Sequence, residues 1–378
     1  WQLELRAADG HLLHTLTPAS LGMKSFVDVD AAGGAAWVLA GDDPTAPQLW
    51  RVSLDPAKGK PEALTREPGV HGAVFGRGHQ ISVRSLTVAD GPPLHTVVDR
   101  TGRSIGTLRS LAETPSVTPR IEFATVGPRG FHAAILRPAR FDAAARYPVI
   151  LSVYGGPHVQ VVTRSRNAFL LQQWFADHGF IVVSLDGRGT PGRGREWERV
   201  LKGDLSEIPL DDQVEGLRAL AEKVPQMDLS RVGVYGWSFG GYFSAMATLR
   251  RPDVFRAGCV GAPVVDWHDY DTFYTERYMG LPDENPKGYE AASVLSYADR
   301  LERPLLIVHG TVDDNVYFVN SMKLTGALFR AGKPFEFLPL AGFTHMVPDP
   351  VVTERLYGRI ERFFEEHVKH AGAAAPEP

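Results

Sequence analysis

The first part of the chain, up to about Pro119, is a series of short runs in which hydrophobic and polar positions alternate. Residues 49–54, Leu-Trp-Arg-Val-Ser-Leu, form one such run, and a turn at residues 58–60 separates it from the next. A period of two places successive side chains on opposite faces of a strand, so this pattern predicts antiparallel hairpins. The hairpins recur roughly every 45 residues, a spacing typical of four-stranded propeller blades.

A closed propeller needs about four to eight such blades, and about two and a half fit into this part of the chain. We therefore predict that residues 1–119 are the C-terminal blades of an incomplete β-propeller; a small β-sandwich is the alternative. Trp1 cannot be a natural translation start and already lies in a strand pattern. We accordingly expect the chain to be the C-terminal part of a longer polypeptide, whose missing N-terminal part completes the propeller.

The hydrophobic pattern changes after Pro148, where four runs are apolar along their whole length: residues 149–154, 180–185, 232–235 and 304–308. Helical patterns lie between and after them, at residues 212–223, 241–250, 318–331 and 352–370. Strands that are apolar throughout are covered on both faces, and strands alternating with helices form a parallel, doubly wound sheet. We predict such an α/β domain over residues 120–370 and a disordered tail over residues 371–378.

The composition is that of a soluble globular protein, with 44% hydrophobic and 22% charged residues. A formal net charge of −4 leaves no positive excess for a phosphate backbone, so nucleic acid is not expected as a partner. No stretch approaches the roughly 20 apolar residues of a membrane span. The single Cys259 excludes an internal disulfide and a thiolate metal site, and its apolar surroundings predict a buried side chain. Without the native N-terminus, the compartment stays open between periplasm and cytoplasm.

The segment Gly236-Trp237-Ser238-Phe239-Gly240 lies between the predicted strand at residues 232–235 and the predicted helix at residues 241–250. This is the context that a nucleophile elbow of an α/β-hydrolase requires, because a sharp turn there presents the serine hydroxyl at the sheet edge. The alternative is a glycine-rich turn in which Ser238 is incidental.

A serine hydroxyl needs a base and an orienting carboxylate, which follow in this architecture in the order Ser, Asp, His. Asp313 and Asp314 come just after the predicted strand at residues 304–308, and His345 comes just after an apolar segment, just before the last helix. Either aspartate could orient the base. His309 competes with His345 for the role of base, but it lies at the strand end before Asp313, and we favour His345.

Three segments of this chain resemble the prolyl oligopeptidase family in its dipeptidyl peptidase IV-like branch: residues 236–242, 274–280 and 309–316. The resemblance runs from about Tyr147 to His370, whereas the N-terminal third is similar in layout only. It implies that Ser238 is the nucleophile, Asp313 the orienting acid and His345 the base.

The resemblance also assigns residues around this triad. Tyr154, in a segment like the family's oxyanion tyrosine, and the backbone N–H of Phe239 would hydrogen-bond the developing oxyanion. The family's proline-accepting pocket matches six residues of this chain: Phe239, Val264, Trp267, Tyr270, Tyr274 and Val316. Asn315 matches a family residue that binds the carbonyl of the penultimate substrate residue. Without the resemblance, the aromatic members of this set would be assigned to the core, and Tyr154 to a packed rim position. Phe239 stands where the family often has tyrosine.

The implied function is that of a serine exopeptidase, which releases N-terminal Xaa-Pro and Xaa-Ala dipeptides through an acyl-enzyme. Such chemistry needs no metal or cofactor, and the implied partners are these peptides and a second copy of the chain in a homodimer. The paired glutamates that grip the substrate's amino terminus in the family lie earlier in the propeller than this chain begins. A prolyl endopeptidase, an acylaminoacyl peptidase, an esterase and a catalytically silent propeller-based interaction protein are the alternatives; a scaffold would need none of the triad.

One further motif points elsewhere. Residues 187–192 fit the G-x-G-x-x-G fingerprint of dinucleotide-binding folds, and Asp211 and Asp212 follow about 20 residues on. But these aspartates begin a helix rather than end a strand, and Pro191 removes a backbone donor from the loop. Residues 193–200 are also too charged to pack as the helix that such a site requires. We therefore predict a surface loop here and no NAD site.

Overall fold

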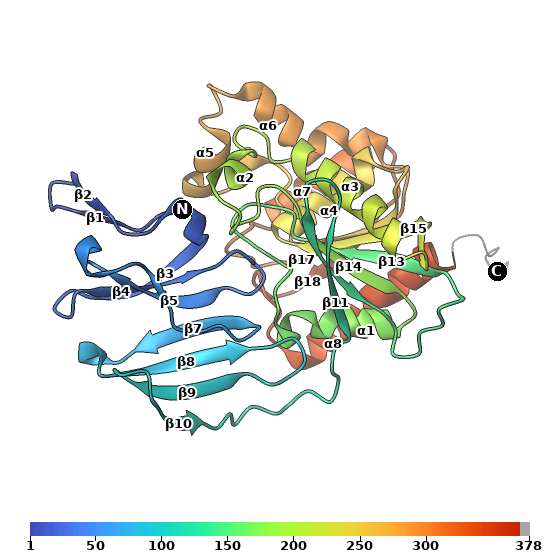
Figure 1. The fold of residues 1–378 in the computed structure, drawn as a ribbon. Helices are drawn as coiled ribbons and strands as arrows, with labels where there is room; N and C mark the ends of the chain where they lie inside the picture. Colours follow the sequence, from blue (N-terminus) through green and yellow to red (C-terminus); the bar gives the residue numbers. More distant parts are fainter. Residues whose placement is uncertain (371–378) are drawn as a thin grey trace. The chain divides into compact units, whose positions relative to one another are not determined.

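The computed structural model describes residues 1–370, so the tail predicted for residues 371–378 lies outside the described residues (Figure 1). The described chain divides into two compact units. The first comprises Trp1–Arg120, Val162–Leu170 and Pro191–Glu198; the second comprises Ile121–Val161, Leu171–Thr190 and the chain from Arg199 onward.

The first unit consists of antiparallel strands that pair in chain order. The strands are β1 (Glu4–Arg6), β2 (Leu12–Thr15), β3 (Met23–Asp30), β4 (Ala35–Ala40), β5 (Gln48–Ser53), β6 (Glu62–Ala63), β7 (Val70–Phe75), β8 (Ile81–Thr87), β9 (Leu94–Asp99) and β10 (Ser104–Leu108). β1 and β2 form a ribbon, β3 to β6 form one four-stranded sheet, and β7 to β10 form another. The predicted antiparallel hairpins are confirmed, and β3 and β7 are strands that the pattern did not single out.

The sheet of β3 to β6 is covered by apolar side chains on both faces. On one face, Val38 and Val52 pack with Leu16, which follows β2. On the other face, the Trp37 ring packs against the tilted ring of Phe75 in β7, with 4.1 Å between the centroids. Successive antiparallel sheets that stack through both faces are the arrangement of consecutive propeller blades.

Residues 162–170 join the first unit through a buried arginine. The Arg166 guanidinium donates hydrogen bonds to the carbonyls of Pro115 and Val117, at 2.7 and 2.8 Å. The backbone N–H of Arg164 donates to the carbonyl of Thr45 at 2.9 Å. These bonds tie the segment to loops of the first unit, which sequence periodicity does not reveal.

The second unit is built on one eight-stranded sheet. Its strands are β11 (Ile121–Val126), β12 (Phe131–Leu136), β13 (Tyr147–Ser152), β14 (Ile181–Asp186), β15 (Met227–Trp237), β16 (Phe255–Gly261), β17 (Leu305–Gly310) and β18 (Glu336–Leu340). Their order in the sheet is β11-β12-β14-β13-β15-β16-β17-β18. β12 pairs antiparallel with β11 and β14. The other neighbours in the sheet pair parallel, in the order β14, β13, β15, β16, β17 and β18. The predicted parallel, doubly wound sheet is confirmed.

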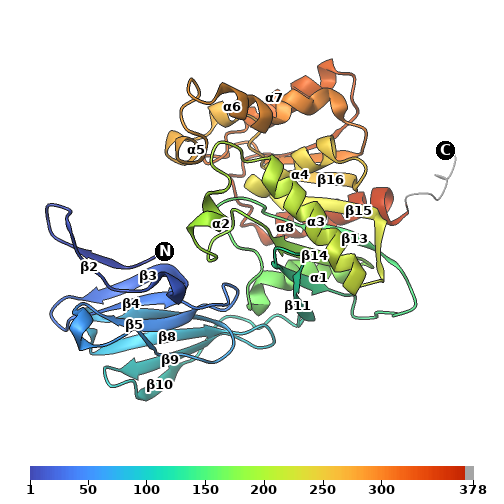
Figure 2. The same cartoon turned by 45° about the horizontal axis from the view of Figure 1, so that its top comes forward.

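Helices cover both faces of this sheet. The helices of the second unit are α1 (Leu170–Asp177), α3 (Glu207–Lys223), α4 (Phe239–Arg250), α5 (Thr272–Met279), α6 (Pro286–Ala292), α7 (Val319–Arg330) and α8 (Pro350–Phe364), which a π-helical turn extends to Lys369. The short helix α2 (Arg195–Arg199) belongs, except for its last residue, to the first unit. Figures 1 and 2 show α3 and α4 on one face of the sheet and α1 and α8 on the other. On that second face, Phe175 of α1 meets Tyr357 of α8 edge to face.

The surface loop predicted at residues 187–192 is a loop, but Gly187, Gly189 and Thr190 in it are buried rather than at the surface. The charged segment that follows, residues 193–200, is not loop throughout. It contains the short helix α2, none of whose residues is buried. The nearby Asp212, the acidic residue of the dinucleotide fingerprint, is fully buried and forms an ion pair with Arg188. This pair ties the glycine loop after β14 to the first turns of α3.

Candidate active site

The predicted site residues follow four parallel strands of the second unit. Tyr154 comes after β13, Ser238 after β15, Asp313 after β17 and His345 after β18. The carboxyl ends of parallel strands meet at one edge of a sheet, so all four residues belong to the same rim. β15 and β17 are separated by β16 alone, and β18 is the neighbour of β17.

Ser238 occupies a strained turn between β15 and α4. Its φ and ψ are 60° and −121°, a backbone conformation that residues other than glycine rarely adopt. Its N–H donates to the carbonyl of Gly261, and its own carbonyl accepts from Tyr242. Although Ser238 is the N-cap of α4, its hydroxyl makes no capping hydrogen bond. The helix therefore does not use the hydroxyl, which a nucleophile must keep available.

The glycines around Ser238 are required by close backbone packing. A Cβ atom at Gly236 would lie 2.2 Å from the carbonyl oxygen of Gly240. A Cβ at Gly240 would lie 2.3 Å from the Val153 oxygen, and a Cβ at Gly241 would lie 2.1 Å from the Gly261 oxygen. The turn is thus pressed against β13 and β16, and any larger side chain would push Ser238 out of position.

Asp313 and His345 form a direct hydrogen bond. Nδ1 of His345 lies 2.7 Å from Oδ2 of Asp313. A carboxylate accepts, so Nδ1 carries the proton and the Nε2 lone pair is left to accept one. Asp314 is exposed, whereas the Asp313 side chain is buried.

Backbone donors hold the other oxygen of Asp313. The N–H groups of Asn315 and Val316 both donate to Oδ1, at 2.9 Å. Burial by itself would raise the pKa of Asp313. Hydrogen bonds from His309, His345 and the Asn315 backbone outweigh burial and hold the pKa well below its ordinary value. Asp313 is therefore a carboxylate at neutral pH.

The two loops that carry Asp313 and His345 are joined by their own hydrogen bonds. The N–H of Val312 donates to the carbonyl of Phe343 at 3.1 Å. The N–H of Gly342 donates to Oγ1 of Thr311 at 2.9 Å. His345 is thus held beside Asp313 by backbone as well as by side-chain contacts.

Tyr154 lies beside the start of α4. Its ring stacks with that of Phe239, with 5.6 Å between the centroids. Burial raises the pKa of the Tyr154 phenol, so its hydroxyl stays protonated at neutral pH and can donate a hydrogen bond. A Cβ at Gly156 would lie 2.4 Å from the Phe239 ring, so a glycine there lets this ring approach.

The residues assigned to a proline pocket lie in one aromatic cluster. Trp267 stacks face to face with Tyr274 at 5.9 Å and packs against Phe239 at 5.7 Å. Tyr270 meets Tyr274 edge to face. Phe239, Val264, Trp267 and Val316 are buried members of the hydrophobic core, which for Phe239 and Trp267 is the position expected without the resemblance.

Polar groups of this cluster face one another or remain without a partner. The Tyr270 hydroxyl donates to Oδ1 of Asn315 at 3.0 Å. The buried Tyr274 hydroxyl has no hydrogen-bond partner within residues 1–370. An unpaired buried hydroxyl costs free energy, and a bound polar group would relieve that cost.

Sequence reasoning missed two aromatic members of the cluster. Tyr242 meets Phe239 and Trp267 edge to face, both at 5.1 Å. Tyr278 meets Tyr274 at 4.9 Å. Both follow a predicted residue by three or four positions on the same helix, and that helical spacing was the signal that could have found them.

Comparison with known proteins identifies the family. Residues 167–371 match the model of the Prolyl oligopeptidase family. The chain belongs to the prolyl oligopeptidase family. It is 36% identical to mouse dipeptidyl peptidase 8 over 300 residues, and this aligned region covers 77% of this chain and 33% of that protein. It is 33% identical over 316 residues to a protein of Emericella nidulans named "Probable dipeptidyl-aminopeptidase B", covering 79% of this chain and 34% of that protein.

A solved structure is similar to this chain in fold as well as in sequence. The crystal structure of Porphyromonas gingivalis dipeptidyl peptidase 4 matches with a TM-score of 0.88 and 29% identity, over 97% of this chain and 53% of that one. The expected α/β-hydrolase fold is thereby confirmed. The chain spans about a third of the length of the curated relatives it matches. Within residues 1–370, none of the helices is long and apolar enough to span a membrane.

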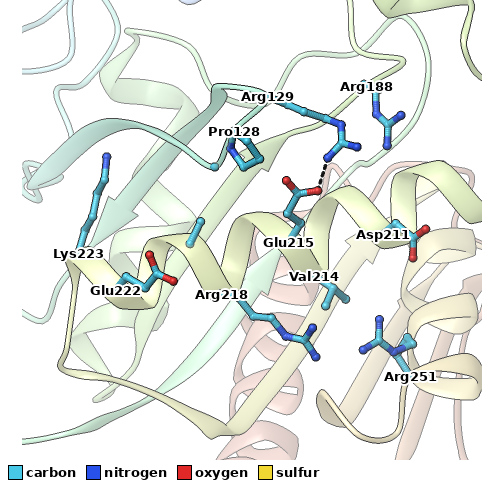
Figure 3. A pocket seen from close by; sticks show the side chains of 12 residues that line it. Pro128, Arg129, Arg188, Asp211, Val214, Glu215, Arg218, Glu222, Lys223 and Arg251 are labelled. Atoms are coloured by element: carbon cyan, nitrogen blue, oxygen red, sulfur yellow. Dashed lines mark hydrogen bonds and ion pairs between the residues drawn. The ribbon is translucent and has the colours of Figure 1, made fainter.

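A separate pocket of about 690 Å³ lies over α3, away from the four strand ends (Figure 3). It is lined largely by charged side chains, several of which are engaged with one another or with neighbours. Arg129 pairs with Glu215, Arg251 pairs with Asp253, and Lys223 donates to the Thr125 carbonyl. We assign no ligand to this pocket.

Proposed function

We propose that this chain carries the catalytic apparatus of a serine peptidase, with Ser238 as nucleophile, His345 as base and Asp313 as orienting acid. The observation that carries the proposal is the 2.7 Å hydrogen bond between Asp313 and His345, at the sheet edge that also bears Ser238. The strained backbone of Ser238 supports it, because such strain is found where a serine is held for attack.

In the proposed reaction, Oγ of Ser238 attacks the substrate carbonyl while its proton passes to Nε2 of His345. Asp313 stabilises the resulting imidazolium. The Tyr154 hydroxyl and the Phe239 N–H donate to the oxyanion. The imidazolium then protonates the departing amine, which leaves an ester on Ser238. Water attacks that ester by the same route, releasing the acid and regenerating the serine.

We propose substrates with proline or alanine second from a free amino terminus, so that the products are Xaa-Pro and Xaa-Ala dipeptides. The aromatic cluster suits a pyrrolidine ring, which is apolar and, once in a peptide bond, has no N–H to satisfy. The names of the relatives, dipeptidyl peptidases and dipeptidyl-aminopeptidases, support release of dipeptides.

We further propose that residues 1–119 are propeller blades, that residues 120–370 are the catalytic domain, and that two copies of the chain form a homodimer. The stacking of the two four-stranded sheets supports the first assignment. Light scattering of the purified chain tests the homodimer, and a monomeric mass at micromolar concentration contradicts it.

Two experiments test the catalytic proposal. A fluorophosphonate should label Ser238 covalently, as located by peptide mass spectrometry, whereas a silent interaction protein would remain unlabelled. A panel of chromogenic Gly-Pro, Ala-Ala and N-blocked Gly-Pro substrates then tests specificity. Cleavage of free Gly-Pro well above the blocked form supports an exopeptidase. Equal or faster cleavage of the blocked substrate would favour a prolyl endopeptidase or acylaminoacyl peptidase instead.

A further inference from the structure

A second histidine contacts the carboxylate of the proposed triad. His309, near the end of β17, is fully buried. Its Nε2 lies 2.8 Å from the carbonyl oxygen of Val316 and 3.2 Å from Oδ2 of Asp313. Its Nδ1 lies 2.7 Å from Oγ of Ser321, a buried residue of α7. Both ring nitrogens are therefore engaged.

These partners fix the tautomer of His309. The Val316 carbonyl and the Asp313 carboxylate can only accept hydrogen bonds, so Nε2 of His309 carries a proton. In the neutral ring Nδ1 is then an acceptor, and the Ser321 hydroxyl donates to it. With both nitrogens occupied inside the core, His309 cannot receive the proton of Ser238.

The contacts of Asp313 are shared between its two oxygens. Oδ1 accepts from the backbone of Asn315 and Val316, whereas Oδ2 accepts from His345 and lies 3.2 Å from Nε2 of His309. The two imidazoles thus meet at one oxygen. Rotation of the carboxylate about its Cβ–Cγ bond would break contacts at both oxygens.

We propose that His309 is a positioning residue that holds Oδ2 of Asp313 toward Nδ1 of His345, with Ser321 holding His309 in the required tautomer. This inference rests on the proposed triad and adds two residues behind it, because polar contacts lead from Ser321 through His309 and Asp313 to His345. His309 acts through Asp313 and touches no substrate. Its loss should therefore slow the chemical step and leave binding unchanged.

The test measures how fast a fluorophosphonate inactivates the whole chain. Its dependence on fluorophosphonate concentration gives two quantities, the maximal rate constant of inactivation and the concentration at which half of that rate is reached. His309→Phe retains a ring but has no donor, and we expect it to lower the maximal rate constant by about 10- to 100-fold. Removing the hydrogen-bond partner of a metal-bound histidine costs about 10- to 100-fold, and we expect a loss of the same order for this histidine, which likewise acts through another residue. The half-saturating concentration should not change. His309→Gln places an amide N–H near the position of Nε2 and should restore most of the rate.

A double-mutant cycle separates positioning from general support of the core. If His309 acts through Asp313, His309→Phe should cause little further loss in an Asp313→Asn background, because coupled residues do not add. Ser321→Ala should reduce the rate less than His309→Phe, since it removes only the tautomer lock. If His309→Phe does not fold, as judged by near-ultraviolet circular dichroism, His309→Asn replaces it, because its shorter side chain does not reach Asp313.

Three results would overturn the inference: equal losses in both backgrounds, a His309→Gln variant as slow as His309→Phe, or a change confined to the half-saturating concentration. Failure of the proposed function looks different. In that case the unaltered chain is not labelled at Ser238 at all, and the proposed triad is rejected together with the role of His309.

Discussion

The indole Nε1–H of Trp237 donates a hydrogen bond to the backbone carbonyl of His345, at 2.9 Å. Trp237 is the last residue of β15 and directly precedes Ser238, whereas His345 follows β18, and β16 and β17 lie between these strands in the sheet. A Cβ at Gly261 would lie 2.1 Å from the indole ring, so the ring rests on the end of β16. One side chain thus ties the nucleophile turn to the loop of the proposed base.

Replacing Trp237 by phenylalanine should lower kcat with little change in KM. The variant keeps a ring on Gly261 but loses the donor to His345, so the imidazole is free to shift. A displacement of about 1 Å in a catalytic group can cost about 10²-fold in rate, which sets the upper limit. Steady-state kinetics on a Gly-Pro substrate measure the effect. Trp50→Phe is the matched control, because its indole also donates to a backbone carbonyl, that of Ala40 in the first unit. An unchanged kcat in Trp237→Phe would refute the positional role.

Ser238→Ala and His345→Ala should each lower turnover by about 10⁶-fold, and the double variant should lose little more. Nucleophile and base act in one proton transfer, so removing either one removes the whole effect. Turnover of the same substrate at high enzyme concentration gives the three values. Losses that multiply in the double variant would mean that the two residues act separately.

Tyr154→Phe should lower kcat by about 10²- to 10³-fold, or about 2.7 to 4 kcal/mol, with a much smaller change in KM. A donor aimed at the oxyanion acts mainly in the transition state, whereas the aromatic ring that packs on Phe239 is retained. Tyr357→Phe serves as control, since its hydroxyl accepts a hydrogen bond from the Tyr235 hydroxyl and its helix, α8, lies on the face of the sheet opposite α4 (Figure 1). A raised KM at unchanged kcat would make Tyr154 a ground-state binding residue.

The central strands of the second unit could be predicted from the sequence because burial on both faces makes them apolar throughout. β14 and β17 are buried along their whole length. β16 was missed because it is rich in small residues, which carry little strand signal. Their smallness has a packing cause, since a Cβ at Gly258 would lie 2.0 Å from Oγ1 of Thr248 on α4. The strand propensity of a sequence does not depend on how closely a helix approaches the strand, so it gives no sign of this contact.

The candidate site was predictable where its residues lie in local motifs and was not predictable where it depends on which side chains face each other. The chain order and the strand ends pointed to Ser238 and His345, but the residues alone left Asp313 and Asp314 equivalent. The two differ in the direction of their side chains, one into the core and one to solvent. His309 could be read only as a rival base, because its contact with Ser321 joins a strand to a helix that local pattern does not pair.

The thiol of Cys259 should not react in the native protein. Cys259 is fully buried in β16, and this burial raises the pKa of its thiol, although the positive charge of Arg359 opposes the shift. The reactive species is the thiolate, so both access and ionisation disfavour reaction. Iodoacetamide followed by mass spectrometry should find no adduct on the native chain and one adduct after unfolding in guanidinium. Rapid stoichiometric labelling of the native chain would contradict the buried position.

Asp313 should make the stability of the protein depend on pH in the acid range. Its pKa in the folded protein lies below the ordinary value of 3.8, so the folded state binds its proton less readily than the unfolded chain does. The stability that the carboxylate contributes is therefore complete above pH 3.8 and is lost as the pH falls through the folded pKa. Asp313→Asn cannot titrate at this position and lacks that dependence.

The difference in urea midpoint between the unaltered chain and Asp313→Asn should accordingly shrink as the pH falls below the ordinary pKa of 3.8. The remaining carboxyl groups are common to both proteins and cancel in the comparison. Asp314→Asn supplies the matched control one residue along, because it leaves His345, His309 and the backbone donors around Asp313 in place. A difference that stays constant down to the lowest pH, or that shrinks equally for Asp314→Asn, would show that the contacts of Asp313 do not stabilise its charged form.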